Sequence, residues 1–157
     1  TQKVVRSGNW HGNDTCWRMV LDLNKCLYDF DGAGLPRKKP LRYLAVVDGI
    51  IGGEGNGPMS PDAKPCGVIL AGTHPAAVDM AAATLMGFDW QKLRLLKNSF
   101  EIRKRNFIPF PPSDISLVSN KPEWDGPLGQ AGGRFAFKPH FGWVGVIERE
   151  PENQAKR

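Results

Sequence analysis

The chain has 157 residues, of which 41% are hydrophobic and 24% are charged. A chain of this length buries roughly 70% of its unfolded surface, so the composition predicts one globular domain and excludes a disordered protein. The formal net charge is +5, and it is local: residues 1–90 carry 9 basic and 9 acidic side chains, whereas residues 92–105 carry 6 basic and 1 acidic. A uniformly basic surface is therefore excluded.

The start of the chain, its longest uncharged stretch and its cysteines indicate the cellular compartment. The longest uncharged stretch, residues 65–78, has 14 residues, fewer than the roughly 18–20 that cross a bilayer. No basic and apolar leader opens the chain, and Cys16, Cys26 and Cys66 form no C-x-x-C pair. These features predict a cytoplasmic protein with free thiols and no membrane span.

A helix is expected from about Thr15, after the polar run at residues 7–14. Asn13 or Asp14 is suited to cap its first turn. Apolar side chains recur at spacings of three and four residues, which is typical of an amphipathic helix. These side chains are Trp17, Val20, Leu21, Leu23 and Leu27.

Two strands and a loop are expected next. Residues 41–47 end in a continuous apolar run and predict a buried strand. Residues 50–65 are rich in glycine and proline and predict a loop. Residues 67–71 predict a second short strand.

A helix then runs from about Pro75 to Met86, with the Thr73 hydroxyl as its cap and Gly87 as its stop. Its sequence is apolar nearly all round, which indicates a helix covered on most sides. The order of elements predicts an α/β layered domain with a mixed or mainly parallel sheet and flanking helices. The remaining expected segments are a short helix at 89–96, strands at 115–119 and 142–147, a single domain over 1–150 and a polar tail at 151–157.

The segment from Asp48 to Pro58 is the first candidate site, because five of its eleven residues are glycine and it follows a strand. Backbone N–H groups of glycine can approach an anion closely, and carboxylates can hold a hard cation. The alternative is a tight structural crossover. The expected anion-binding residues are Gly53, Gly55 and Asn56. The expected ligands of a divalent cation are Asp48, Glu54 and Asp79, and Asp79 has a structural tether as its alternative.

The second candidate site is the segment from Ser7 to Arg18, which crowds polar side chains around two tryptophans. A helix N-terminus offers free N–H groups to an anion, and histidine titrates near neutral pH. Asn9, Asn13 and Arg18 are the expected anion-binding residues. His11 and Asp48 are the expected catalytic residues, and His11 is the one expected to move protons. The alternative is helix capping, with the tryptophans in the core.

The basic window at residues 92–105 has two interpretations. Leucines alternate with its charges, which is typical of a solvated helix face over a buried stripe. A patch of this kind also fits a polyanion or a protein partner. No sequence signature of a nucleic-acid-binding fold accompanies it, so a nucleic-acid partner is not expected.

Four segments together resemble one bacterial and archaeal family that is catalogued as a domain of unknown function. They are S-G-N-W-H-G-N-D-T-C-W-R, V-V-D-G-I-I-G-G-E-G-N-G-P, V-I-L-A-G-T-H-P-A-A-V-D and L-M-G-F-D-W. The resemblance implies that the chain is the C-terminal part of a longer family domain. Some members are fused to ferredoxin-like iron–sulfur modules, but their cysteine clusters are absent here, so no iron–sulfur cluster is expected.

The function expected from the sequence is an anion- or metal-binding cleft at the glycine-rich segment, acting on a phosphorylated or carbohydrate-related small molecule. Two alternatives stay open: a non-catalytic binding module, and a redox accessory that docks an iron–sulfur protein. The sequence leaves open whether the protein is an enzyme. A divalent cation is the only cofactor it suggests.

Overall fold

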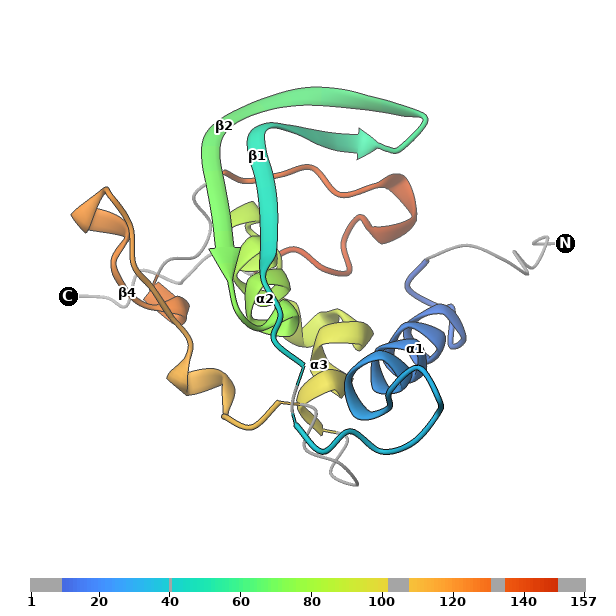
Figure 1. The fold of residues 1–157 in the computed structure, drawn as a ribbon. Coiled ribbons are helices and arrows are strands. Elements are labelled where there is room, and N and C mark those ends of the chain that lie inside the picture. The colour runs from blue at the N-terminus through green and yellow to red at the C-terminus, as the bar shows by residue number, and fades with distance from the viewer. Residues whose placement is uncertain (1–9, 40, 102–107, 131–134, 150–157) are drawn as a thin grey trace, which may run out of the picture.

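The computed structural model describes residues 10–39, 41–101, 108–130 and 135–149. A long β-hairpin lies against helix α2, helices α1 and α3 lie below it, and the C-terminal segment runs beneath the far end of the hairpin (Figure 1). The longer elements are α1 (Cys16–Asp29), β1 (Ala45–Asn56), β2 (Ser60–Gly72), α2 (Pro75–Met86) and α3 (Arg94–Glu101). The short ones are strands β3 (Ser116–Leu117) and β4 (Gly126–Pro127), with single-turn helices at 90–92, 112–114, 122–124, 128–130 and 141–143.

The mixture of helices and strands is confirmed, but the parallel sheet is wrong. In the described ranges, β1 pairs with β2 and β3 pairs with β4, and both pairs are antiparallel. Only residues 57–59 separate β1 from β2. A connection that short can join only antiparallel strands, because a parallel pair needs a crossover of roughly a dozen residues or more.

The loop expected at residues 50–65 is instead the outer part of this hairpin. Ala45 pairs with Gly72 at one end and Asn56 with Ser60 at the other, with a bulge between Gly49 and Ile51. Glycine occurs in β1 because neighbouring groups pack where its side chain would lie. At Gly52, a Cβ atom would meet the Phe137 ring at 2.7 Å.

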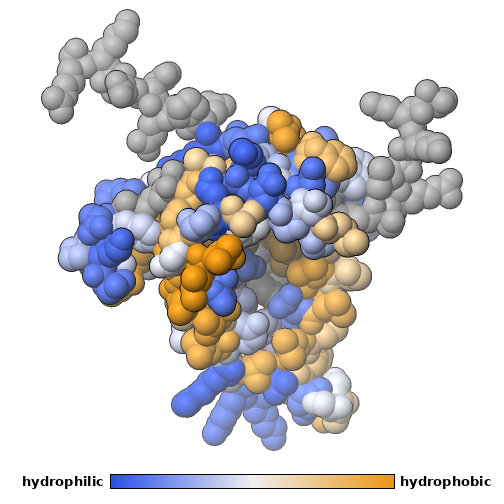
Figure 2. All heavy atoms as spheres, turned by 90° about the horizontal axis from the view of Figure 1, so that it is seen from above, coloured by the Kyte–Doolittle hydropathy of each residue, from blue (hydrophilic) through white to orange (hydrophobic). Residues whose placement is uncertain are grey.

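The hairpin is also more exposed than expected. The strand predicted at 41–47 begins only at Ala45, and Leu44 and Val46 are 67% and 59% exposed. Ile69, in the strand predicted at 67–71, lies within β2 and is 68% exposed. Apolar side chains form broad areas around a hollow on the face seen from above (Figure 2).

The helix predicted from about Thr15 and the helix predicted from Pro75 to Met86 are both confirmed. α1 occupies the expected range, and α2 ends immediately before Gly87. Thr73 does not cap α2, because His74 occupies the cap position and makes no capping bond there. No described helix has the length and apolar character to cross a bilayer.

Helix α2 forms the centre of the core, as its apolar sequence predicted. One of its faces joins a buried cluster, and another face joins a second. Gly72 lies so close to α2 that a Cβ atom there would meet the Val78 side chain at 2.7 Å. The first cluster contains Met80, Ala81, Ile115 and Leu128, and the second contains Ala83, Phe88, Leu96 and Ile147.

The later elements differ from their predictions. The helix expected at 89–96 divides into a single turn at 90–92 and α3. The strand expected at 115–119 is reduced to β3. Residues 142–147 form no strand: a helical turn covers 141–143, and Glu148 bridges to Phe88. The tail at 151–157 lies outside the described residues.

A buried carboxylate fastens the C-terminal segment to the hairpin. Glu54 is 8% exposed, and its Oε2 accepts a hydrogen bond from the Lys138 backbone N–H at 3.0 Å. The Lys64 ammonium lies 3.1 Å from the same oxygen, and the Lys138 ammonium lies 3.7 Å from Oε1. Gly55 adds a backbone bond to the Lys138 carbonyl at 3.0 Å. We call Glu54, Lys64 and Lys138 the Glu54 clamp.

The Glu54 clamp favours the charged carboxylate. The Lys138 N–H, followed by Lys64, holds the pKa of Glu54 below its usual 4.5. The stabilisation is therefore present above pH 4.5 and is lost as pH falls through the lowered pKa. The carboxylate of Glu54 thus has a structural role in the hairpin.

Replacing Glu54 by glutamine tests the Glu54 clamp. Glu54→Gln keeps the size of the side chain but loses both ion pairs, so its free energy of unfolding at neutral pH falls below that of the wild type. The gap narrows below pH 4.5, where the wild-type carboxylate also loses its charge. Urea unfolding across this pH range measures both effects. Asp62→Asn, an exposed acid on the same hairpin, is the control, and an equal loss in both variants would contradict the clamp.

Candidate functional site

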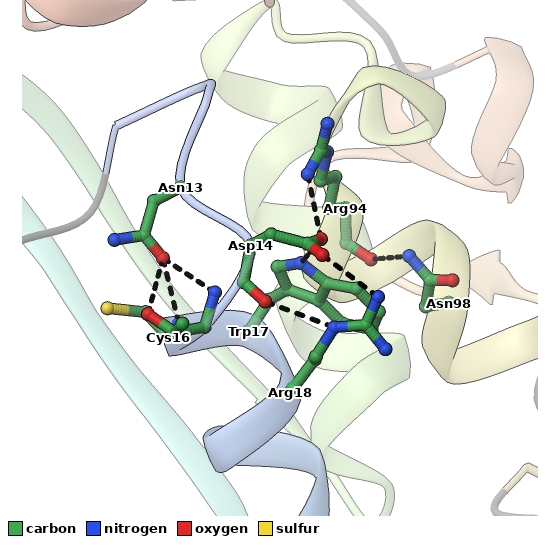
Figure 3. Close-up of polar contacts among 8 residues, drawn as sticks. Asn13, Asp14, Cys16, Trp17, Arg18, Arg94 and Asn98 are labelled. Atoms are coloured by element: carbon green, nitrogen blue, oxygen red, sulfur yellow. Dashed lines mark hydrogen bonds and ion pairs between the residues drawn. The ribbon is translucent and has the colours of Figure 1, made fainter.

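The start of α1 is organised by Asn13. Its side-chain oxygen accepts hydrogen bonds from the backbone N–H groups of Thr15 and Cys16 at 2.8 and 3.0 Å, and from the Thr15 hydroxyl at 2.9 Å (Figure 3). Of the two predicted capping residues, Asn13 therefore satisfies the first free N–H groups. The side-chain oxygen of Asn13 is thus already engaged in hydrogen bonds with Thr15 and Cys16.

Asp14 joins α1 to α3. Its Oδ1 accepts from the Trp17 indole N–H at 3.0 Å and from the Arg94 guanidinium at 2.9 Å, and its Oδ2 accepts from Arg18 at 3.0 Å (Figure 3). Arg18, and then Trp17, lower the pKa of this carboxyl. Both arginines are thus directed at Asp14, including Arg18, which was expected to bind an anion.

Trp10 folds back over Gly12. A Cβ atom at Gly12 would lie 1.8 Å from Cζ3 of the Trp10 ring, so any side chain there would displace the indole. The Trp10 Nε1 atom is buried and has no hydrogen-bond partner among the described residues. A buried donor without a partner is rare in proteins and calls for an explanation.

His11 connects this segment to the C-terminal part of the chain. Its Nδ1–H donates to the Gly142 carbonyl at 2.9 Å, which leaves Nε2 as the acceptor of the neutral ring. The His11 ring makes edge contacts with the rings of Trp10 and Trp143, with centroids 6.0 and 6.4 Å apart. Residues that are 131 positions apart in sequence are thereby brought together.

These side chains form part of a cavity of about 270 Å³, which we call the tryptophan pocket. The indoles of Trp10, Trp17 and Trp143 line it together with apolar side chains of α2 and α3. Its polar lining includes His11 and Asp79. Aromatic walls with a few converging polar groups are typical of small-molecule sites.

Asp79 differs from the other polar side chains of the pocket because it has no partner within the described residues. It projects from α2, is open to solvent, and makes no hydrogen bond or ion pair with any residue in the described ranges. The atoms that surround the carboxyl raise its pKa by desolvation, and no basic side chain opposes the shift. Asp79 is therefore a carboxylate without a partner at the edge of an apolar cavity.

The structure separates Asp79 from the other predicted metal ligands. Asp48 is exposed on β1, where its Oδ1 accepts from the Ile50 N–H at 3.1 Å, and Glu54 belongs to its clamp. Neither lines the tryptophan pocket. In the part of the chain that the structure describes, no three His, Cys, Asp or Glu side chains are grouped to hold a metal ion.

The glycine-rich segment packs against protein. A Cβ atom at Gly53 would meet the Pro61 ring at 3.0 Å, and the Gly55 N–H donates to Lys138. Asn56 is the exposed last residue of β1. The described structure thus favours the structural crossover for Gly53 and Gly55. Asn9 lies outside the described residues.

The basic window is also partly used within the fold. The Lys92 ammonium donates to the Glu148 carbonyl at 3.0 Å, and Lys97 lies 3.9 Å from Glu101. Arg94, which binds Asp14, lines a wide groove of about 690 Å³ between α1 and α3. Acidic and basic side chains alternate and pair along this groove, so it lacks a dominant charge. Residues 103–105 of the window lie outside the described residues.

Sequence reasoning gave Asp14 the role of a helix cap within the second candidate segment and gave Arg94 no role in a site. The spacing of four between Asp14 and Arg18 is a signal for their ion pair, since such residues face each other on a helix. Nothing local indicates Arg94, which is 80 positions from Asp14. Trp143 lies in the segment that was expected to be a strand at 142–147, and nothing local indicates that it joins Trp10 and Trp17.

The chain belongs to the family described as Domain of unknown function (DUF362), whose model matches residues 3–84, more than half of the chain. The match contains Trp10, Trp17 and Asp79, whereas Trp143 lies beyond it. No curated protein and no solved structure matched the chain significantly. The resemblance seen in the sequence is confirmed at the level of the family.

Gly12→Ala tests the placement of Trp10. The added methyl group cannot coexist with the indole in its present position, so the ring moves and the free energy of unfolding falls below that of the wild type. Gly32→Ala is the matched control, because a Cβ atom there meets nothing within 4 Å. Chemical denaturation gives the energies, and the Trp10 indole N–H signal in NMR reports the ring. Equal behaviour of the two variants would refute the close contact.

Asp79→Asn tests the environment of the carboxyl. The folded state disfavours the charged form, so the wild type is penalised as pH rises from 3.8 through the raised pKa. The variant therefore unfolds at higher denaturant concentration than the wild type at neutral pH, and the difference vanishes below pH 3.8. Urea titrations at several pH values measure this, beside the exposed Asp62→Asn. A variant less stable than the wild type at neutral pH would show that Asp79 has a stabilising partner.

Proposed function

We propose that this domain binds a small organic molecule in the tryptophan pocket. The observation that carries the proposal is the unpaired carboxylate of Asp79 at a cavity walled by three indoles. Asp79 is exposed, so water can reach its carboxylate, but the neighbouring atoms partly desolvate it and no basic side chain of the described residues offsets this. Features that cost stability in this way are typical of functional sites.

The size and walls of the pocket set the kind of ligand. A cavity of about 270 Å³ is at the lower end of the range for small-molecule sites. Aromatic and apolar walls suit a ring or a compact apolar group, and the carboxylate suits a hydrogen-bond donor. The buried Trp10 N–H adds a donor near the same walls. A carbohydrate-related molecule remains within this class.

The proposal transfers the expected site from the glycine-rich segment to the segment around Trp10 and to Asp79. It is a proposal of binding rather than catalysis, because the described pocket presents one unpaired carboxylate and no second acid positioned beside it. Its position between the N-terminal segment, α2, α3 and the turn at 141–143 means that a ligand would contact all four parts.

NMR of the tryptophan indole N–H groups tests the proposal. The chain has 5 tryptophans, and we expect a bound fragment to shift the signals of Trp10, Trp17 and Trp143 while Trp90 and Trp124 stay in place. The probe is a set of neutral, cationic and anionic fragments small enough for the cavity. Fragments that shift none of the three signals, at any charge, would contradict the proposal.

A pocket-filling variant supplies the control. Ala82 lines the cavity, so Ala82→Leu occupies part of it and abolishes the fragment-induced shifts. Ala33→Leu makes the same change at an exposed position in a turn and leaves the shifts intact. Shifts that survive in Ala82→Leu would place binding elsewhere.

A further inference from the structure

The positive groups around the tryptophan pocket are already used by the protein. Arg94 lines the cavity, but its guanidinium is directed at Asp14, which also binds Arg18 (Figure 3). The Nδ1–H group of His11 donates a hydrogen bond to the Gly142 carbonyl, so it is not available to an anion either. An anion entering the pocket would therefore compete with Asp14 for the arginines and would meet the Asp79 carboxylate.

The negative group of the pocket is not used. Asp79 has no partner in the described ranges, and the partial desolvation of its carboxyl by neighbouring atoms is the only cause that raises its pKa. If the Arg94 guanidinium approached Asp79 closely, it would instead pull that pKa down. The charge of Asp79 is thus available to a ligand, whereas the charge of Arg94 is neutralised at Asp14.

The walls favour the same sign of charge. The face of an indole ring is negative, and tryptophan is the aromatic side chain that attracts cations most strongly. Three indoles line this cavity, and one of them, Trp17, already holds a cation over its ring, since the Arg18 guanidinium carbon lies 4.4 Å from the ring centroid. A carboxylate beside several aromatic faces is a known arrangement for alkylammonium groups, which are large, weakly hydrated cations.

We propose that the ligand is a small organic cation, an alkylammonium or guanidinium compound, held with its charge at Asp79 and its apolar part among Trp10, Trp17 and Trp143. This inference rests on the proposed function and narrows it to one class of ligand. A bare metal ion does not fit the described pocket, because Asp79 and His11 are the only His, Cys, Asp or Glu side chains among its lining residues, and no three such groups lie together in the described ranges. The cation relieves the unpaired charge of Asp79, and its alkyl groups cover the apolar walls.

Choline and its neutral isostere, in which a tert-butyl group replaces the trimethylammonium group, test the inference. They have nearly the same shape and differ in charge, so calorimetric titration at fixed ionic strength isolates the role of the charge. We expect choline to bind at least about tenfold more tightly than the isostere, which corresponds to about 1.4 kcal/mol. Ethylammonium and guanidinium serve as further cations, and acetate and inorganic phosphate as anions.

Variants of Asp79 assign the effect to its charge. Asp79→Asn reduces choline affinity about tenfold or more and leaves the affinity for the isostere unchanged, whereas Asp79→Glu keeps part of the preference. Asp62→Asn, which removes an exposed acid elsewhere, leaves the preference intact. Circular dichroism and the indole N–H signals confirm that each variant is folded.

The outcomes separate this inference from the proposed function. Equal binding of choline and its isostere, a preference for acetate or phosphate, or full cation affinity in Asp79→Asn would overturn the inference while binding in the pocket stands. Failure of all three cations, when neutral fragments shift the pocket indoles, would overturn it as well. If no fragment of any charge reaches the pocket, the proposed function fails and the inference fails with it.

Discussion

The buried carboxylate of Glu54 holds together two parts of the chain that are more than 80 residues apart. It binds Lys64 on the neighbouring strand and both the backbone and the ammonium of Lys138. A buried carboxylate that lost these partners would be costly, so the C-terminal segment must lie where it does. Five residues beyond Lys138, that segment supplies Trp143 to the tryptophan pocket. The pocket therefore depends on an interaction between the hairpin and the C-terminal segment.

Two of the carboxylates in the family segments, Glu54 and Asp79, have opposite electrostatic environments. Glu54 is surrounded by donors that lower its pKa, whereas Asp79 has only surroundings that raise it. The first stabilises the fold as an anion, and the second destabilises it as an anion. The direction of the pKa shift therefore distinguishes Glu54, which stabilises the fold, from Asp79, which is a candidate for function. The sequence had predicted both as metal ligands.

The sequence predicted the features that depend on local physics. The period of α1, the apolar sequence of α2 and its end before Gly87 are all properties of consecutive residues, and the structure has them. The hairpin was missed because glycine and proline usually mark a loop, whereas here Gly52 leaves room for Phe137, a residue 85 positions away. Asp14–Arg94 and His11–Gly142 were missed for the same reason. For the candidate site, the sequence singled out the segment around Trp10 as an anion site and Asp79 as a metal ligand, but it did not bring the two together, because their proximity arises from tertiary packing.

A crystal structure of the protein grown with choline is the most direct test of the account. We predict the trimethylammonium group within ion-pair distance of the Asp79 carboxylate, in contact with the indoles of Trp10, Trp17 and Trp143, and with Arg94 still bound to Asp14. An empty pocket in which a basic side chain of the protein itself neutralises Asp79 would contradict the account. So would choline bound at another surface while the tryptophan pocket is closed.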